Sequence, residues 1–179
     1  PLPERLVIEL TAHRTLALVQ PHIDACIELR SIDGRFGEVG RWLQDALQNQ
    51  RRTVVLATGD PLFHGIGKLL LGLLGENALE ILPAPSTYQL AFARLKRPWQ
   101  DAALISLHGG DYGEWQPGAS ADHGCMPLLR AAQRHNRIAC LTAPANTPAR
   151  IARTLLAAGM DGDFLLSVAA RLEMPDEAL

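Results

Sequence analysis

The chain has 179 residues, of which 47% are hydrophobic and 20% are charged, and its formal net charge is −2. This length can bury the core of one large domain or two small ones, and the composition is that of a globular protein. The charge balance lacks the basic footprint of nucleic-acid-binding proteins. The apolar runs are too short to cross a bilayer, and the N-terminus does not resemble a signal segment, so we expect a cytoplasmic protein.

The three cysteines, Cys26, Cys125 and Cys140, are scattered along the chain without CxxC spacing. An odd number of cysteines fits a reducing compartment better than a disulfide framework, so we expect them to be packing residues. His123 lies near Cys125, but one histidine and one cysteine are too few ligands for a zinc ion. We therefore expect no metal site.

The first 50 residues predict a strand followed by helices. Residues 5–10 are a short apolar run suited to a strand, and residues 12–19 form a short helical pattern that ends before Pro21. The Asp-Gly pair at residues 33–34 indicates a turn. Residues 36–49 predict an amphipathic helix, because apolar residues recur at helical spacing. These apolar residues are Val39, Trp42, Leu43, Ala46 and Leu47.

A strand, loop and helix follow. Residues 53–57 are an unbroken, β-branched apolar run, which is typical of a parallel strand buried on both faces. The run stops at residues 58–61, and a helical pattern resumes over residues 66–74 until Gly75 ends it. The order predicts that the loop lies at the carboxyl end of a buried strand.

The rest of the chain continues the alternation. Residues 80–82 predict a short strand, Pro83-Ala84-Pro85 a rigid connection, and Ser86 can cap a helix over residues 88–95. Beyond it we expect strands at 102–107, 137–142 and 164–169, helices at 126–135 and 148–158, and a long loop at 109–124. This pattern predicts an α/β fold with largely parallel sheets.

The loop that starts at Thr58 is the best candidate for a ligand site, because ligands of open α/β sheets bind beyond the carboxyl ends of strands. Gly59 and Gly65 allow the backbone to approach a ligand closely, Asp60 offers a carboxylate, and Pro61 stiffens the bend. A Gly-Asp-Pro sequence is also common in simple turns. The loop lacks both the Gly-Lys-Ser/Thr ending of a phosphate loop and the GxGxxG pattern, so phosphate-driven binding is not expected.

Three ordered blocks between residues 53 and 108 carry a resemblance to a known family. They are VVLATGDPLFHGIG, ILPAPSTYQLAFARL and PWQDAALISLHG. In these blocks the chain resembles the tetrapyrrole-methylase family, and within it the enzymes that methylate carbon C5 in cobalamin biosynthesis. Weaker matches extend the resemblance to nearly the whole chain: TAHRTLAL, NTPARIARTLLAAG and VAARLEMPDEAL.

The resemblance implies a two-lobed α/β tetrapyrrole-methylase fold, with S-adenosylmethionine bound in a cleft between the lobes, and a homodimer. We expect an N-terminal lobe over residues 1–83, a linker over 84–87 and a C-terminal lobe over 88–179. The family normally opens with a strand and a Gly-x-Gly-Pro-Gly loop, which the sequence does not show. We therefore expect the first family strand to be missing from the N-terminal lobe.

The resemblance also implies which residues bind the cofactor. The loop after residues 53–57 matches the cofactor loop of the family, and two residues after the linker match further cofactor contacts. These residues are Thr58, Gly59, Asp60, Phe63, Ser86 and Thr87. His64 replaces a commoner tyrosine, and Lys96-Arg97 adds charge where the family is often neutral, which bears on the substrate preference.

Basic residues are candidates for binding the carboxylates of a corrin precursor, because a guanidinium group binds a carboxylate through two hydrogen bonds. We single out Arg14 and Arg94, with Lys96 and Arg97 next, although most surface arginines are merely solvated. His108 follows a predicted strand, where a histidine can act as a general base or form a hydrogen bond with the substrate. An ordinary histidine at the end of a strand explains it equally well.

The reaction implied by the resemblance is methyl transfer from S-adenosylmethionine to C5 of precorrin-6Y, precorrin-7 or its cobalt form. The decarboxylating C15 methylation would belong to a fused domain or a partner protein. Three alternatives stay open: another tetrapyrrole or diphthine methyltransferase, a non-catalytic scaffold for the C15 enzyme, and a metal chelatase that uses histidines.

Overall fold

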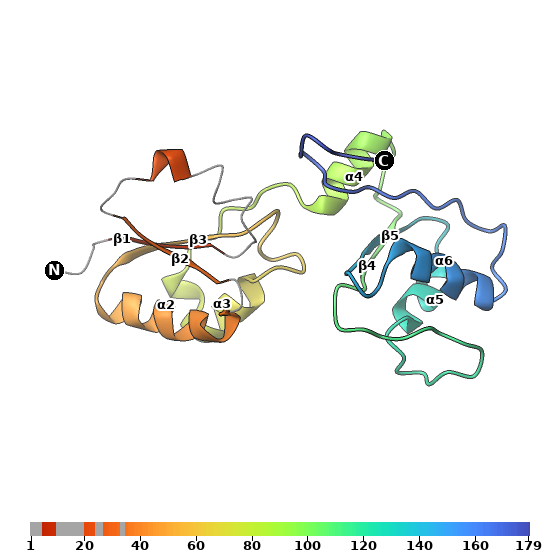
Figure 1. The fold of residues 1–179 in the computed structure, drawn as a ribbon, viewed down its shortest axis with the longest axis horizontal. Coiled ribbons are helices and arrows are strands. Elements are labelled where there is room, and N and C mark those ends of the chain that lie inside the picture. Colours follow the sequence, from red (N-terminus) through yellow and green to blue (C-terminus); the bar gives the residue numbers. More distant parts are fainter. Residues whose placement is uncertain (1–4, 10–19, 24–26, 33–34) are drawn as a thin grey trace. The chain divides into compact units, whose positions relative to one another are not determined.

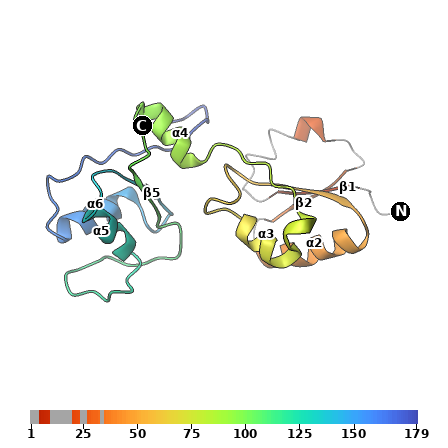
Figure 2. The ribbon, with the colours of Figure 1, turned by 180° about the vertical axis from the view of Figure 1, so that it is seen from behind.

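The computed structural model describes residues 5–9, 20–23, 27–32 and 35–179 (Figures 1 and 2). The chain divides into two compact units, unit 1 (Pro1–Ser86) and unit 2 (Thr87–Leu179). The division falls inside the segment 84–87 that we expected to be a linker, and the linker itself stays a prediction. The helix predicted at 12–19 and the turn predicted at 33–34 lie outside the described residues.

Unit 1 contains a parallel sheet of three strands. β1 (Arg5–Glu9) lies between β2 (Ile27–Ser31) and β3 (Arg52–Leu56). Parallel strands need long crossover connections, and the helical segment between β2 and β3, which flank β1, supplies one. The predicted strands at 5–10 and 53–57 are confirmed as β1 and β3.

β2 was not predicted, because its apolar positions alternate with charged ones. Glu28 and Arg30 of this strand are half-buried and form an ion pair of 2.5 Å. Arg51, just before β3, is buried, and its Nη1 lies 2.9 Å from Oε2 of Glu28. Its Nη2 pairs with Asp45 of the helix that precedes β3. An ion pair with Arg51, which is distant in sequence, thus stabilises a strand whose own sequence reads as polar.

Two helices cover the same side of this sheet in both views (Figures 1 and 2). They are α2 (Val39–Gln48) and α3 (Gly67–Leu74), and they confirm the helices predicted at 36–49 and 66–74. Short 3₁₀ turns are η1 (Gln20–His22), η2 (Phe36–Glu38) and η3 (Glu76–Ala78). The core consists of Ile32, Val39, Trp42, Leu43, Ala46 and Leu70.

Two apolar positions of unit 1 are more exposed than we predicted. Leu47 is 56% exposed, so it does not belong to the buried face of α2. Val54 is 54% exposed, whereas its neighbour Val55 packs against the core. Successive strand residues point to opposite faces, and the described helices α2 and α3 cover only one of them. The prediction that this strand is buried on both faces is therefore wrong.

Unit 2 contains two parallel strands, β4 (Ala103–Ser106) and β5 (Ile138–Leu141), in which Ile105 pairs with Cys140. Its helices are α4 (Thr87–Leu95), α5 (Met126–Ala132) and α6 (Pro148–Ala157). The core consists of Leu107, Leu128 and Ile151, with Ile105, Tyr112, Ile138, Cys140 and Leu155 packed against it. The strands at 102–107 and 137–142, the three helices and the loop at 109–124 are confirmed.

Two predicted strands are absent from the described residues. Residues 80–82 and 164–169 both lack strand pairing, and Leu82 and Leu165 are 77% and 95% exposed. An apolar run becomes a strand only where a neighbouring strand satisfies its backbone groups. Towards its end the chain makes an isolated antiparallel bridge between Ala170 and Ala178 instead.

Candidate functional site

The candidate residues lie in the loops that follow β3 and β4, and at the start and near the end of α4. Thr58, Gly59, Asp60 and Phe63 share the loop between β3 and α3 in unit 1. Ser86 ends unit 1, while Thr87, Arg94 and His108 belong to unit 2. Arg14 lies outside the described residues.

The β3–α3 loop folds back on itself through short hydrogen bonds. Gly59 has a φ of 73°, a left-handed conformation that favours glycine. Oδ1 of Asp60 accepts a hydrogen bond from the backbone N–H of Leu62 at 2.9 Å, and its carbonyl oxygen accepts one from Phe63 at 3.1 Å. This is an Asx-type turn, in which the aspartate side chain fixes the bend that follows the strand.

Two further glycines of this loop are required by its own packing. A Cβ atom at Gly65 or Gly67 would lie 2.6 or 2.7 Å from the carbonyl oxygen of Pro61. The backbone N–H of Gly67 donates to that same oxygen at 2.7 Å. Gly65 was expected to make room for a ligand, but the structure gives it a role inside the loop. His64, which directly precedes Gly65, adopts a left-handed φ of 57°.

The loop still presents polar and apolar groups outward. The Thr58 residue is exposed, and within the described residues Oδ2 of Asp60 has no hydrogen-bond donor. The half-buried ring of Phe63 meets the imidazole of His64 edge-on, with ring centroids 4.9 Å apart. A carboxylate oxygen, a hydroxyl and an aromatic surface within six residues can recognise a ligand that is both cationic and aromatic.

The first turn of α4 is fastened to the sheet of unit 2. The helix begins at Thr87, which places the buried Ser86 at the N-cap position expected for it. The hydroxyl of Tyr88 donates to the carbonyl oxygen of Ile105 and accepts from the backbone N–H of Leu141 at 3.3 Å. Thr87 is therefore held beside the ladder between β4 and β5.

His108 lies two residues beyond the end of β4 and is exposed. Its Nδ1 is 2.8 Å from the carbonyl oxygen of Thr142, which follows β5. A carbonyl oxygen can only accept, so Nδ1 carries the proton in this contact. In the neutral ring this leaves the lone pair on Nε2, which can then accept a hydrogen bond or a proton.

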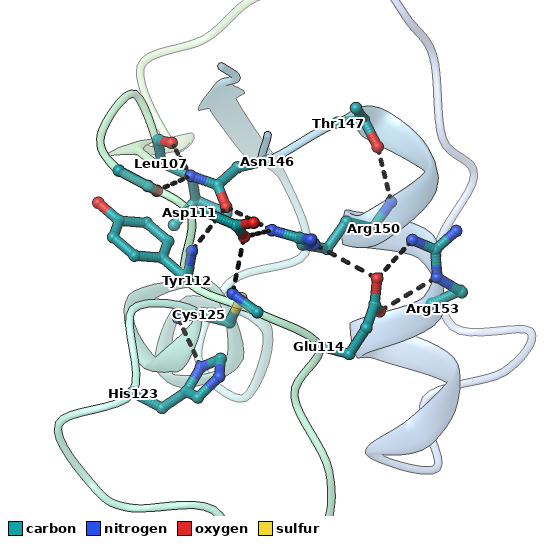
Figure 3. Close-up of polar contacts among 12 residues, drawn as sticks. Leu107, Asp111, Tyr112, Glu114, His123, Cys125, Asn146, Thr147, Arg150 and Arg153 are labelled. Atoms are coloured by element: carbon teal, nitrogen blue, oxygen red, sulfur yellow. Dashed lines mark hydrogen bonds and ion pairs between the residues drawn. The ribbon is translucent and has the colours of Figure 1, made fainter. Parts of the chain in front are cut away.

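The loop after His108 is tied to the start of α6 by residues that we did not predict (Figure 3). Nδ2 of the fully buried Asn146 donates to the carbonyl oxygens of Leu107 and Gly110 at 2.9 and 2.8 Å. Its Oδ1 accepts from the backbone N–H of Tyr112 at 3.4 Å and from Nη1 of Arg150 at 3.0 Å. The only sequence signal was the Asn-Thr-Pro that precedes a helix, which also describes an ordinary helix start.

Carboxylates of the loop pair with arginines of α6 (Figure 3). Nη1 of Arg150 lies 2.5 Å from Oδ1 of Asp111, and Nη2 of Arg153 lies 2.6 Å from Oε1 of Glu114. The pKa of Asp111 is lowered mainly by the backbone N–H of Gly113 and then by Arg150. Glu114 also has a lowered pKa, chiefly because of Arg153. These pairs are exposed, so they add little to stability singly and serve mainly to orient the loop.

The ring of Tyr112 explains two glycines of the same loop. A Cβ atom at Gly124 would overlap this ring, and one at Gly109 would overlap its hydroxyl oxygen, so the tyrosine lies against both glycines. Tyr112 also packs against the core of unit 2. A loop without regular secondary structure is thus held in one conformation by a partly buried aromatic residue and a buried amide.

Arg94 has a carboxylate partner within its own unit. Its Nε lies 2.6 Å from Oε1 of Glu177, and its Nη2 lies 3.3 Å from Oε2. This pairing raises the pKa of Arg94 and lowers that of Glu177. The proposed role of Arg94 in substrate binding therefore requires that a substrate carboxylate compete with Glu177. Lys96 and Arg97 follow on the surface, and Lys96 has a φ of 52°.

A depression on the surface of unit 2 lies away from these loops. It is lined by Asp101, Arg134, His135, Asn136 and Arg137, which precede β4 or β5. It is thus at the amino ends of the strands, whereas ligands of such sheets bind at the carboxyl ends.

Among the described residues no group of three His, Cys, Asp or Glu side chains could hold a metal ion. None of the helices in the described part is long and apolar enough to span a membrane.

Comparison with known proteins shows that the chain matches a protein family over nearly its whole length. The model of the family described as Tetrapyrrole (Corrin/Porphyrin) Methylases matches residues 4–179. A cobalt-precorrin-7 C(5)-methyltransferase of Salmonella typhimurium is 31% identical over 143 residues, which are 80% of this chain and 62% of the relative.

Two longer relatives match shorter stretches. A decarboxylating precorrin-6Y C(5,15)-methyltransferase of Mycobacterium tuberculosis is 34% identical over 123 residues, 69% of this chain and 27% of the relative. One from Sinorhizobium sp. is 48% identical over 56 residues, 31% of this chain and 14% of the relative. The chain thus spans less than two thirds of each of these three curated relatives.

Proposed function

Because this chain belongs to the tetrapyrrole (corrin/porphyrin) methylase family, we propose that it transfers a methyl group from S-adenosylmethionine to C5 of a corrin precursor in cobalamin biosynthesis. The names of the Salmonella and M. tuberculosis relatives support C5 as the target, with precorrin-7, its cobalt form or precorrin-6Y as the substrate class. The two-lobed arrangement with a cofactor cleft and the homodimer belong to the same proposal.

The observation that carries the cofactor assignment is the Asp60 carboxylate in the β3–α3 loop. Its Oδ1 is used to build the turn, and Oδ2 has no donor within the described residues. S-adenosylmethionine carries an ammonium group, a sulfonium and ribose hydroxyls, all of which suit a carboxylate oxygen. Thr58 can add a hydroxyl and Phe63 an apolar surface. The residues present therefore fit this cofactor.

When bound, S-adenosylmethionine supplies a methyl group on a positively charged sulfur, which an electron-rich ring carbon can accept without a covalent enzyme intermediate. The contribution of the chain is then alignment and exclusion of water. We assign cofactor binding to Thr58, Gly59, Asp60 and Phe63, together with Ser86 and Thr87. Nε2 of His108 is assigned to accept a hydrogen bond or proton from the substrate, since Nδ1 is bound to Thr142.

The substitution Asp60→Asn tests this assignment sharply. Asparagine keeps an Oδ1 atom that can accept from Leu62, so the turn is preserved, while Oδ2 is replaced by an amide that donates. Loss of one charge-assisted hydrogen bond of about 1.5–3 kcal/mol weakens binding roughly tenfold to a hundredfold. We therefore expect the Kd for S-adenosylhomocysteine, measured by calorimetry, to rise by that factor.

The matched control is Glu76→Gln, which removes an exposed carboxylate of the same unit outside the loop. It should leave the Kd within a factor of two of the wild-type value. An unchanged Kd for Asp60→Asn, or equal effects of the two variants, would remove Asp60 from the cofactor site.

A further inference from the structure

We propose that Asn146 is a positioning residue that fixes the loop after β4 and thereby the tautomer of His108. This inference rests on the proposed function in so far as His108 serves the reaction. Nothing in the sequence pattern assigns such a role to Asn146, whose neighbours Thr147 and Pro148 suffice to start α6.

Three of the four hydrogen bonds of the Asn146 side chain are made with the loop, and one is made with Arg150 of α6. The cap of α6 is Thr147, whose Oγ1 accepts from the backbone N–H of Arg150 at 3.2 Å. Asn146 uses both donors and both acceptor positions of its amide, and three of its four partners are backbone groups of residues 107–112. Both Nδ2 partners are carbonyls and both Oδ1 partners are N–H groups, so the orientation of the amide is unambiguous.

The two donated bonds bracket His108. They end on the carbonyl oxygens of Leu107 and Gly110, so only His108 and Gly109 lie between the two anchors. The backbone N–H of Leu107 also donates to Leu141 at 2.8 Å, which extends the sheet ladder up to the first anchor. The backbone of His108 therefore has little freedom to rotate.

The ring of His108 is held by the turn that contains Asn146. Its Nδ1 contacts the carbonyl oxygen of Thr142, and Ala143 donates its backbone N–H to the carbonyl oxygen of Asn146 at 3.3 Å. Residues 142–146 thus form one turn that fixes the imidazole at one end and the backbone around it at the other. If the loop shifts, Nδ1 loses its acceptor, and the proton is no longer restricted to that nitrogen.

The substitution Asn146→Asp breaks this arrangement with almost no change of volume. A carboxylate cannot donate a hydrogen bond, so one of its oxygens would face the carbonyl oxygens of Leu107 and Gly110. These buried oxygens would repel one another. The opposite oxygen keeps Arg150 as a partner, which favours a folded variant. We expect the loop of residues 107–112 to move away from residue 146.

The test is ¹⁵N NMR of the histidine-labelled protein, with His108→Gln used to assign the signal. Wild-type His108 should show a protonated Nδ1 and an unprotonated Nε2, and Asn146→Asp should lose this signature. Thr147→Ala is the matched control, because it removes the cap of α6 and should lower the unfolding midpoint without touching the loop. Its His108 signal should match the wild type.

Kinetics of methyl transfer supply the second readout. A misplaced histidine should lower kcat about tenfold or more, as expected for lost acid–base assistance, while the Kd for S-adenosylhomocysteine stays within a factor of two. Asn146→Ser, which keeps one hydrogen-bond donor, should show an intermediate loss of kcat. It provides a second variant should the aspartate variant not fold.

A wild-type His108 signal in a folded Asn146→Asp variant, or an equal loss of kcat in Thr147→Ala, would overturn the proposal. Because the NMR readout needs no turnover, it decides the role of Asn146 even if the proposed reaction fails.

Discussion

The hydroxyl of Tyr88 in α4 donates a hydrogen bond to the carbonyl oxygen of Ile105 in β4. It also accepts from Leu141 of β5, so one side chain joins the helix to both strands of unit 2. Burial raises the pKa of Tyr88 to about 12, because the interior disfavours the phenolate. The hydroxyl therefore stays neutral and able to donate at physiological pH.

We expect Tyr88→Phe to lower the free energy of unfolding by about 1–2 kcal/mol, the usual loss for a buried hydrogen bond. Urea denaturation followed by circular dichroism measures this change. The control is Tyr112→Phe, since the chain has two tyrosines and the Tyr112 hydroxyl has no hydrogen-bond partner among the described residues. Equal unfolding midpoints for the two variants would contradict the role given to Tyr88.

Alkaline titration gives an independent check on Tyr88. Its folded pKa is raised above the ordinary 10.0, so its stabilising contribution is complete below about pH 10 and is lost as the pH rises towards 12. In the folded protein, the change of ultraviolet absorbance that Tyr88→Phe abolishes should therefore appear only well above pH 10. Ionisation of Tyr88 at its ordinary pKa of 10.0 would be inconsistent with a buried hydroxyl.

Gly59 and Gly75 provide a matched pair for testing the cofactor loop. Both have positive φ values, 73° and 75°, so alanine should cost on the order of 1–3 kcal/mol of stability at either position. Only Gly59 lies in the β3–α3 loop, whereas Gly75 ends α3. We expect Gly59→Ala to weaken S-adenosylhomocysteine binding about tenfold in calorimetry, and Gly75→Ala to leave it unchanged. Equal losses of affinity in both variants would mean that backbone strain weakens binding, and not the position of Gly59 in the cofactor loop.

Substitutions of Arg94 and Glu177 test whether Arg94 binds the substrate or only holds the C-terminal segment through its ion pair with Glu177. If Arg94 meets a substrate carboxylate, Arg94→Ala should raise the KM for the corrin precursor about tenfold, the effect of one charge-assisted pair. Glu177→Gln should not raise it, because it removes the competing carboxylate. Steady-state methylation assays measure both. Equal increases in KM would show that the ion pair acts by holding the C-terminal segment. Arg14→Ala is expected to behave like Arg94→Ala.

The cysteines of unit 2 should be unreactive. Burial raises the pKa of Cys140 to about 11, and Cys125 is 1% exposed. At pH 7.5 the Cys140 thiolate is then a fraction of roughly one in three thousand, and the thiolate is the reactive form. Iodoacetamide should label neither residue in the folded protein within an hour, but both in urea, as mapped by mass spectrometry. Rapid labelling of either residue in the native state would contradict its packing role.

The fold was predictable where local pattern and tertiary packing agree. The β3–loop–α3 segment carries an apolar strand, a turn and a glycine stop, and the structure has all three. β2 escaped prediction because Glu28 and Arg30 are stabilised by ion pairs, with Arg51 reaching Glu28 from outside the strand. The apolar run around Leu165 was predicted as a strand, yet among the described residues it has no pairing partner.

The site was predictable only in part. The loop from Thr58 and the position of His108 followed from the rule that ligands bind at the carboxyl ends of strands. Asn146 did not follow, because its partners lie 36 and 39 residues away and depend on how a loop without periodicity folds. The pairing of Arg94 with Glu177, separated by 83 residues, was hidden for the same reason.

The central claim is methyl transfer to C5, and incubation of the protein with methyl-¹³C-labelled S-adenosylmethionine and precorrin-7 or its cobalt form tests it most directly. The account predicts a new ¹³C-methyl signal on the corrin product, coupled to C5, whose rate of appearance falls at least tenfold with Asp60→Asn at subsaturating cofactor. Transfer to a different ring carbon, or no transfer by protein that binds S-adenosylhomocysteine, would contradict it.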